Sequence, residues 1–162
     1  MSDTPVLQTH ATTTAVTENL LVRLAETFER LGRIYLDEQA GFFETLDALS
    51  AEQASSPVLG TTIAAQVFHT AFYIQTLERY LKDASAETDW RESWTTRSVT
   101  REQWDALRTR LQDDYACAVQ QLREAPSRGD DKLEFALDIV IHSAYHLGAI
   151  RQLVKAVKKE TI

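Results

Sequence analysis

The chain has 162 residues, of which 44% are hydrophobic, and its formal net charge is −7. A chain of this length fits one domain. The acidic balance argues against nucleic acid or an anionic membrane as the partner, because either would require a clustered basic surface. We therefore expect a small molecule or another protein as the partner.

The cysteine content and the N-terminal residues favour a cytoplasmic location. Cys117 is the only cysteine, so no intramolecular disulfide can form and no oxidising compartment is needed. Its helical context indicates a small buried hydrophobe rather than a nucleophile. The N-terminus has no basic segment followed by an apolar one, and no apolar run reaches the roughly 18 residues of a membrane span.

The first part of the chain predicts a tail followed by a long helix. Residues 1–16 contain many threonines and almost no hydrophobic periodicity, which predicts a flexible N-terminal tail before a domain over residues 17–162. From Thr17 to Leu49 apolar residues recur at steps of three and four, which predicts one long amphipathic helix. Gly32 and Gly41 would bend this helix or admit a close neighbour.

Two connections and a second helix follow. Residues 50–60 contain Pro57 and Gly60 and predict a short connection. A helix is expected from about Thr61 to Leu81, with Thr61 or Thr62 as its N-cap. Residues 82–99 contain two tryptophans, Trp90 and Trp94, and show no sustained period. At about 3.3 Å per residue this long connection can cross the length of a bundle, so the second and third helices could run parallel.

Two capping boxes predict the last two helices. Thr100-Arg-Glu-Gln103 opens a third helix that is expected to end near Pro126. Asp131-Lys-Leu-Glu134 repeats the signature and opens a fourth helix reaching about Lys158. No segment shows sustained alternation with β-branched residues. The sequence therefore predicts an all-α fold, a four-helix bundle.

Three histidines indicate a metal site. His142 and His146 are four residues apart in an apolar stretch, so both imidazoles project from one helix face, and His69 lies near the middle of the second helix. A lone histidine on an apolar face is usually a hydrogen-bonded core residue. Metal binding explains all three at once, because neutral imidazole is a good ligand for Zn²⁺, Ni²⁺ or Fe²⁺.

The residues around the three histidines limit the reactions that such a metal site could catalyse. No glutamate follows His142, so the metalloprotease pattern is absent. Three neutral ligands leave the charge of a dication uncompensated, which favours an anionic group at an open position. Asp138 is equally compatible with a fourth ligand or orienting partner and with a simple preference for the helix N-terminal half. Tyr145 more readily suits packing than acid/base chemistry, and Arg151 suits a solvated or ion-paired role better than substrate binding.

The motif His142-Ser-Ala-Tyr-His146-Leu-Gly148-Ala-Ile150, preceded by a histidine in the second helix, resembles the DinB/YfiT-like metalloenzyme superfamily. The resemblance extends from about Glu18 to Lys158. It implies an up-down-down-up four-helix bundle, a divalent-metal site at His69, His142 and His146, and frequent homodimers. Family members often have glutamine where this chain has Ala149, which puts a shared substrate contact in doubt.

The resemblance also bears on activity. Characterised members of that superfamily include enzymes that transfer or isomerise with bacillithiol, mycothiol or glutathione. The leading hypothesis is thus a metal-dependent thiol S-transferase or isomerase, or a hydrolase-like enzyme. The alternative is a noncatalytic metal- or ligand-binding stress-response protein, and a structural protein with three core histidines comes third. Gly148 costs a helix about 1 kcal/mol relative to alanine, which favours a close-packing or metal-site role for it.

Overall fold

The computed structural model describes residues 4–29, 31–32, 34–124 and 129–160, and these residues confirm the all-α class. They contain no strand, apart from an isolated bridge between Val58 and Thr61. Four helices are long: α1 (Thr4–Phe28), α4 (Ile63–Lys82), α5 (Arg101–Glu124) and α6 (Gly129–Glu160). Shorter elements are α2 (Phe42–Asp47), α3 (Ala51–Ser55) and the 3₁₀ helix η1 (Trp90–Trp94).

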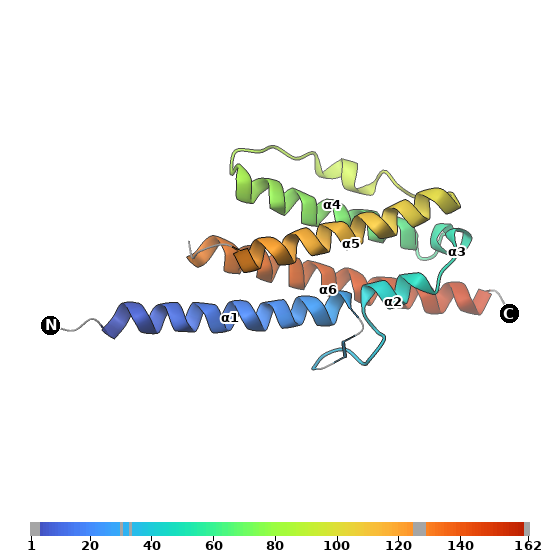
Figure 1. Cartoon of the computed structure of the whole chain (residues 1–162). Coiled ribbons are helices and arrows are strands. Elements are labelled where there is room, and N and C mark those ends of the chain that lie inside the picture. Colours follow the sequence, from blue (N-terminus) through green and yellow to red (C-terminus); the bar gives the residue numbers. More distant parts are fainter. Residues whose placement is uncertain (1–3, 30, 33, 125–128, 161–162) are drawn as a thin grey trace.

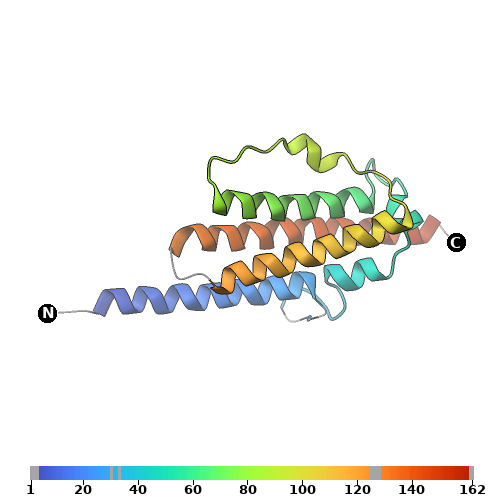
Figure 2. The same cartoon turned by 45° about the horizontal axis from the view of Figure 1, so that its top comes forward.

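The four long helices pack side by side around one core. α6 lies against both α1 and α4, and α5 lies against α4 and, less extensively, α1. In Figure 1, α1 and α6 run from left to right, whereas α4 and α5 run from right to left. Figure 2 shows that the first part of α1 extends beyond the ends of the other helices. None of the described helices combines the length and the apolarity that crossing a membrane requires.

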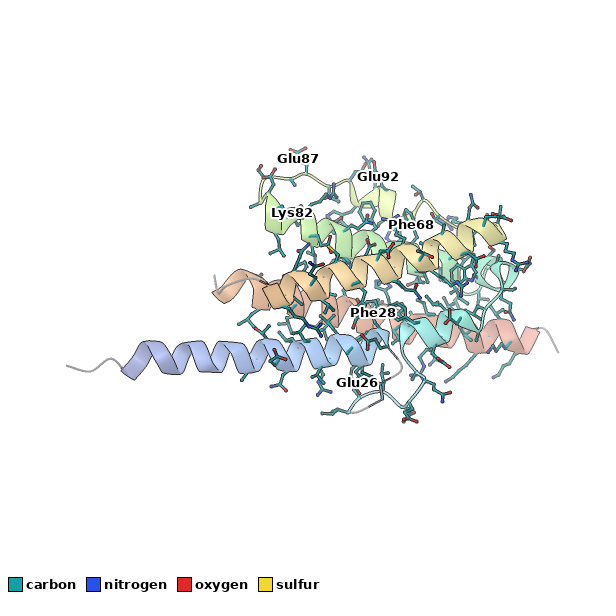
Figure 3. The ribbon with its side chains drawn as sticks, viewed as in Figure 1. Glu26, Phe28, Phe68, Lys82, Glu87 and Glu92 are labelled. Atoms are coloured by element: carbon teal, nitrogen blue, oxygen red, sulfur yellow. The ribbon has the colours of Figure 1, made fainter. Side chains whose placement is uncertain are left out.

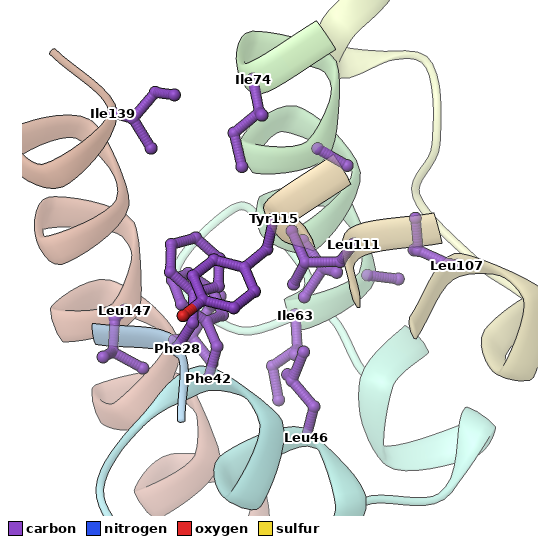
Figure 4. Packing of buried hydrophobic residues seen from close by; sticks show 14 of the residues in the cluster. Phe28, Phe42, Leu46, Ile63, Ile74, Leu107, Leu111, Tyr115, Ile139 and Leu147 are labelled. Carbon is purple, nitrogen blue, oxygen red and sulfur yellow. The ribbon is translucent and has the colours of Figure 1, made fainter. Parts of the chain in front are cut away.

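Aromatic and aliphatic side chains from six helices form the hydrophobic core, part of which is shown in Figure 4. The Phe28 ring stacks on Phe42 at a centroid distance of 5.0 Å and on Tyr115 at 4.7 Å. Trp104 is buried on α5 and donates a hydrogen bond from its indole nitrogen to the Leu49 carbonyl, at 3.1 Å. Burial of this apolar surface holds α4 and α6 in fixed register, which positions the histidines.

The predicted single helix over residues 17–49 is wrong in its second half. α1 ends at Phe28, and an irregular segment leads to α2. The reason is the buried Glu26 carboxylate, which accepts hydrogen bonds from the backbone N–H groups of Ile34, Tyr35 and Leu36. Those N–H groups would otherwise bond within a helix, so the side chain stabilises the turn instead.

Glycines make the same turn sterically possible. A Cβ atom at Gly32 would lie 2.2 Å from the Glu38 backbone nitrogen, and one at Gly41 would lie 2.2 Å from the Glu29 carbonyl oxygen. These approaches exclude any side chain. The expectation that the two glycines admit a close neighbour therefore holds, although the neighbour is the chain's own returning backbone.

The helix starts differ from expectation in three places. α1 begins at Thr4, so residues 4–16 are helical, and the flexibility of residues 1–16 stays a prediction. Residues 51–55, expected to be part of a connection, form α3 behind a capping box at Ser50. α6 begins at Gly129, two residues before the predicted cap, and the expected end of the third helix at Pro126 lies outside the described residues.

Two predicted caps are confirmed. The Thr62 hydroxyl accepts a hydrogen bond from the Ala65 backbone N–H at the start of α4. At the start of α5, the Thr100 hydroxyl accepts from the Gln103 N–H and the Gln103 side chain accepts from the Thr100 N–H. Between these helices, the long connection contains η1, which packs against α4. The caps and η1 together hold in place the face of α4 that carries His69.

Candidate metal centre

Three histidines from two helices converge in the structure. His69 projects from α4, and His142 and His146 project from α6 one turn apart. One ring nitrogen from each lies within 4.8 Å of the others, and the described part of the chain holds no other such group of histidine, cysteine or acidic residues. The ring centroids are 4.4 to 5.0 Å apart. The three side chains could therefore hold one metal ion.

Gln66 orients the buried imidazole of His146. The Gln66 amide oxygen lies 2.6 Å from His146 Nδ1. An amide oxygen only accepts, so Nδ1 carries the proton and Nε2 keeps its lone pair free. The Gln66 amide nitrogen donates to the Thr61 hydroxyl at 3.3 Å, which fixes which way the amide points. A hydrogen bond of this kind at the second ring nitrogen is usual for metal-binding histidines.

Ser93 of η1 has the same role for His69. The buried Ser93 hydroxyl lies 2.8 Å from His69 Nδ1 and donates its proton to the Trp90 carbonyl at 2.7 Å. The serine oxygen must then accept from His69, which again leaves Nε2 unprotonated. The Trp94 indole stacks on the His69 ring at a centroid distance of 4.0 Å. Trp94 of the long connection therefore covers one side of the His69 ring.

His142 is held by stacking rather than by a hydrogen bond. Its ring lies on Tyr73 at a centroid distance of 3.6 Å and an interplanar angle of 4°. Its Nδ1 is buried without a hydrogen-bond partner. Such an atom is costly in a folded protein, and metal ligation is one way to satisfy it. The donor set therefore fits a divalent cation.

Asp138 does not join this group. It is not among the three side chains whose ligand atoms cluster, and it makes no hydrogen bond to His142 Nδ1. Its charge acts on Tyr73, whose pKa is raised first by burial and then by Asp138. The structure thus supports neither the ligand role nor an orienting bond to that nitrogen.

All three imidazoles are neutral at pH 7. Burial lowers the pKa of His142 to about 3, with further contributions from the neighbouring His146 and His69. Burial and then His69 lower the pKa of His146 to about 4, and burial alone lowers that of His69. Neutral imidazole is the form that binds metal, so at pH 7 no positive charge on the three rings opposes cation binding.

The remaining sequence candidates lie at the edge of the site or outside it. Tyr145 is 73% exposed, and its ring meets His146 edge-on at 5.0 Å. Arg151 is partly exposed and follows the site along α6. The close-packing or metal-site role expected for Gly148 is wrong within this chain, because a Cβ there would meet nothing within 4 Å.

Sequence reasoning missed two functional partners. No role is assigned to Gln66 from the sequence, although its position one turn before His69 is a usable signal. Ser93 carried no signal, because it lies in an irregular connection whose path the sequence does not reveal. Gln66 and Trp94 also line a pocket of about 280 Å³ that includes Arg97. A small ligand could thus reach the vicinity of the histidines.

Comparisons with known proteins add no family assignment. A scan against protein-family models, a search of curated proteins and a search of solved structures each find no match for this chain. The resemblance to the DinB/YfiT-like superfamily thus rests on the histidine motif, its spacing and the order of the helices.

Proposed function

We propose that His69, His142 and His146 bind one divalent cation, Zn²⁺, Ni²⁺ or Fe²⁺, in a DinB-like four-helix bundle of up-down-down-up topology. We further propose that the protein is a metal-dependent enzyme that uses a low-molecular-weight thiol, as an S-transferase or isomerase. The observation that carries the proposal is the convergence of three neutral imidazoles within 4.8 Å. Hydrogen bonds at Nδ1 of two of them support it.

Charge favours an exogenous thiol. Three neutral ligands contribute no negative charge, so an anionic group is favoured at any open position. When bound, a dication would supply the positive charge that stabilises a thiolate at neutral pH. Within the chain, Arg97 at the neighbouring pocket offers a positive charge to a carboxylate of such a thiol.

The chain's own thiol is poorly suited to this role. Cys117 lies on α5 and is half-buried, and burial together with a hydrogen bond to Glu78 raises its pKa. A raised pKa keeps the thiol protonated and unreactive at pH 7. It also does not line the pocket beside Gln66 and Trp94. The nucleophile is therefore proposed to come from outside the chain.

We also propose that the protein forms homodimers. Leu137, Ile141 and Tyr145 follow one another at four-residue spacing on α6, and they are 46%, 59% and 73% exposed. An exposed apolar stripe on a helix is a typical contact surface between subunits. The occupant proposed here is a second copy, because the resemblance implies dimers.

Cobalt substitution tests the metal and thiol proposals together. Elemental analysis of purified protein should find about one divalent ion per chain, and the triple variant His69/His142/His146→Ala should lose it. Adding bacillithiol, mycothiol or glutathione to the Co²⁺ form should produce a thiolate-to-cobalt absorption band. Conjugation of the thiol to a small electrophile should be lost in His146→Ala, while circular dichroism shows an intact fold.

The outcomes separate the candidate functions. A metal-loaded protein whose spectrum no thiol perturbs would be a noncatalytic metal- or ligand-binding protein. Full metal occupancy in the triple variant would reject the histidine site. No metal in the wild type would leave a structural role for the three side chains.

A further inference from the structure

A second pocket lies between α4 and α5, and none of the three histidines lines it. It has a volume of about 790 Å³, is open to solvent, and is lined by residues of α4, α5 and the segment Glu92 to Thr95. Figure 3 labels three of its lining residues: Phe68 where α4 meets α5, Lys82 at the end of α4, and Glu92 on the connection above them.

Two buried carboxylates line this pocket with unsatisfied oxygens. Glu78 and Asp114 are 9% and 8% exposed, and Glu78 Oε1 and Asp114 Oδ2 are both buried without a hydrogen-bond partner. The pKa of each is raised, first by burial, and the charge of Asp114 adds to the shift of Glu78. Buried carboxylate oxygens of this kind normally accept a hydrogen bond, so each of the two could accept one from a ligand.

The two arginines of the pocket already have partners, but neither donates a hydrogen bond to Glu78 Oε1 or Asp114 Oδ2. Arg79 donates to the hydroxyls of Thr76 and Thr88. Arg110 donates to the Gln75 amide oxygen and lies over the Phe68 ring. Its Nε also forms an ion pair with Asp114 Oδ2 at 3.7 Å, a distance too long for a hydrogen bond. Lys82 is exposed at the rim.

The side chains that line the pocket suit an organic cation better than a metal ion. No three ligand atoms of Glu78, Asp114 and Cys117 lie close enough to be grouped as a metal site in the described chain. An ammonium group has three donors and tolerates the wider spacing. The aromatic rings of Phe68 and Phe72, 6.4 Å apart, offer an apolar wall to its carbon chain.

We propose that this pocket binds the ammonium group of a small organic amine, with the carboxylates of Glu78 and Asp114 as acceptors and with Phe68 and Phe72 against the carbon chain. The site is independent of the proposed metal centre, since the two share no side chain. It gives the protein a second ligand class, a primary alkylamine or a molecule that carries one.

Calorimetric titration with n-butylamine tests the proposal. At pH 8 the wild type should bind the amine, and n-butanol, its neutral counterpart, should bind much more weakly. Glu78→Gln and Asp114→Asn should each weaken amine binding by about tenfold to a hundredfold, because each removes a charged acceptor. The matched control is Glu87→Gln, which removes the same charge from an exposed side chain outside the pocket (Figure 3) and should bind like the wild type.

Further measurements keep the test decisive. His142→Ala should retain amine binding, which separates this site from any amine ligation at the metal centre. Thermal unfolding of each variant identifies any that fails to fold, and Asp114→Asn then serves in place of Glu78→Gln. Equal affinity for amine and alcohol, or an equal loss in Glu78→Gln and Glu87→Gln, would overturn the proposal.

Discussion

Replacing Gln66 with leucine should weaken metal binding without removing a ligand. Both Gln66 and His146 are buried, and the 2.6 Å contact between them is the one hydrogen bond found at His146 Nδ1. Leucine has nearly the same volume but accepts no hydrogen bond, so the imidazole loses the partner that sets its tautomer and orientation. Losing such a partner typically costs 10- to 100-fold in metal affinity, or about 1.4 to 2.7 kcal/mol.

The variant Gln66→Glu is the matched control. Its carboxylate keeps an acceptor in the same place, and a charged acceptor strengthens the bond to Nδ1–H. We therefore expect Gln66→Glu to bind Co²⁺ at least as tightly as the wild type, and Gln66→Leu to bind it about 10- to 100-fold more weakly.

Competition for Co²⁺ against a coloured chelator measures the Co²⁺ affinities of Gln66→Leu and Gln66→Glu in the same assay. Urea unfolding of the metal-free proteins separates affinity from stability, since an unpaired buried Nδ1–H should cost Gln66→Leu about 1 to 3 kcal/mol. The reasoning would be refuted if Gln66→Leu bound Co²⁺ within about twofold of the wild type, a change too small for a lost orienting bond.

Three further predictions concern acid stability, helix stability and assembly. Because the pKa of His146 is lowered from 6.5 to about 4, its contribution to the stability of the metal-free protein is complete above pH 6.5 and is lost as the pH falls toward 4. The loss should reach about 3 kcal/mol in urea unfolding, and a leucine at position 146 should remove this part of the pH dependence. Gly148→Ala should raise stability by about 1 kcal/mol, since a Cβ there meets nothing; a loss instead would reveal a neighbouring subunit. Sedimentation should show a homodimer that Ile141→Glu dissociates, and a strictly monomeric wild type would reject it.

The helices around the histidines were predictable because their signals are local. The caps at Thr62 and Thr100 each depend on only three or four consecutive residues, and the structure contains both. The spacing of His142 and His146 likewise places both on one face of any helix. Their approach to His69 could be inferred only from the apolar faces of two helices, which the core packing then satisfies.

The break after Phe28 was not predictable in the same way. Residues 29–41 keep a helical spacing of apolar residues, and what competes with the helix is one buried carboxylate, Glu26, that binds three backbone N–H groups up to ten residues away. Helix propensity and hydrophobic periodicity contain no information about such a tertiary contact. The same holds for Ser93, which lies 24 residues after His69, beyond the end of α4 and a stretch of irregular chain.

The stack of Trp94 on His69 gives the protein an intrinsic optical reporter. The chain has only three tryptophans, and Trp94 lies 4.0 Å from a candidate ligand ring, whereas Trp104 is buried on α5 in the hydrophobic core. Loading the site with Co²⁺ or Ni²⁺, whose partly filled d shells quench fluorescence, should therefore dim the emission of the native protein. Trp94→Phe should abolish most of that change and Trp104→Phe should preserve it, so occupancy can be followed at low protein concentration without any added dye.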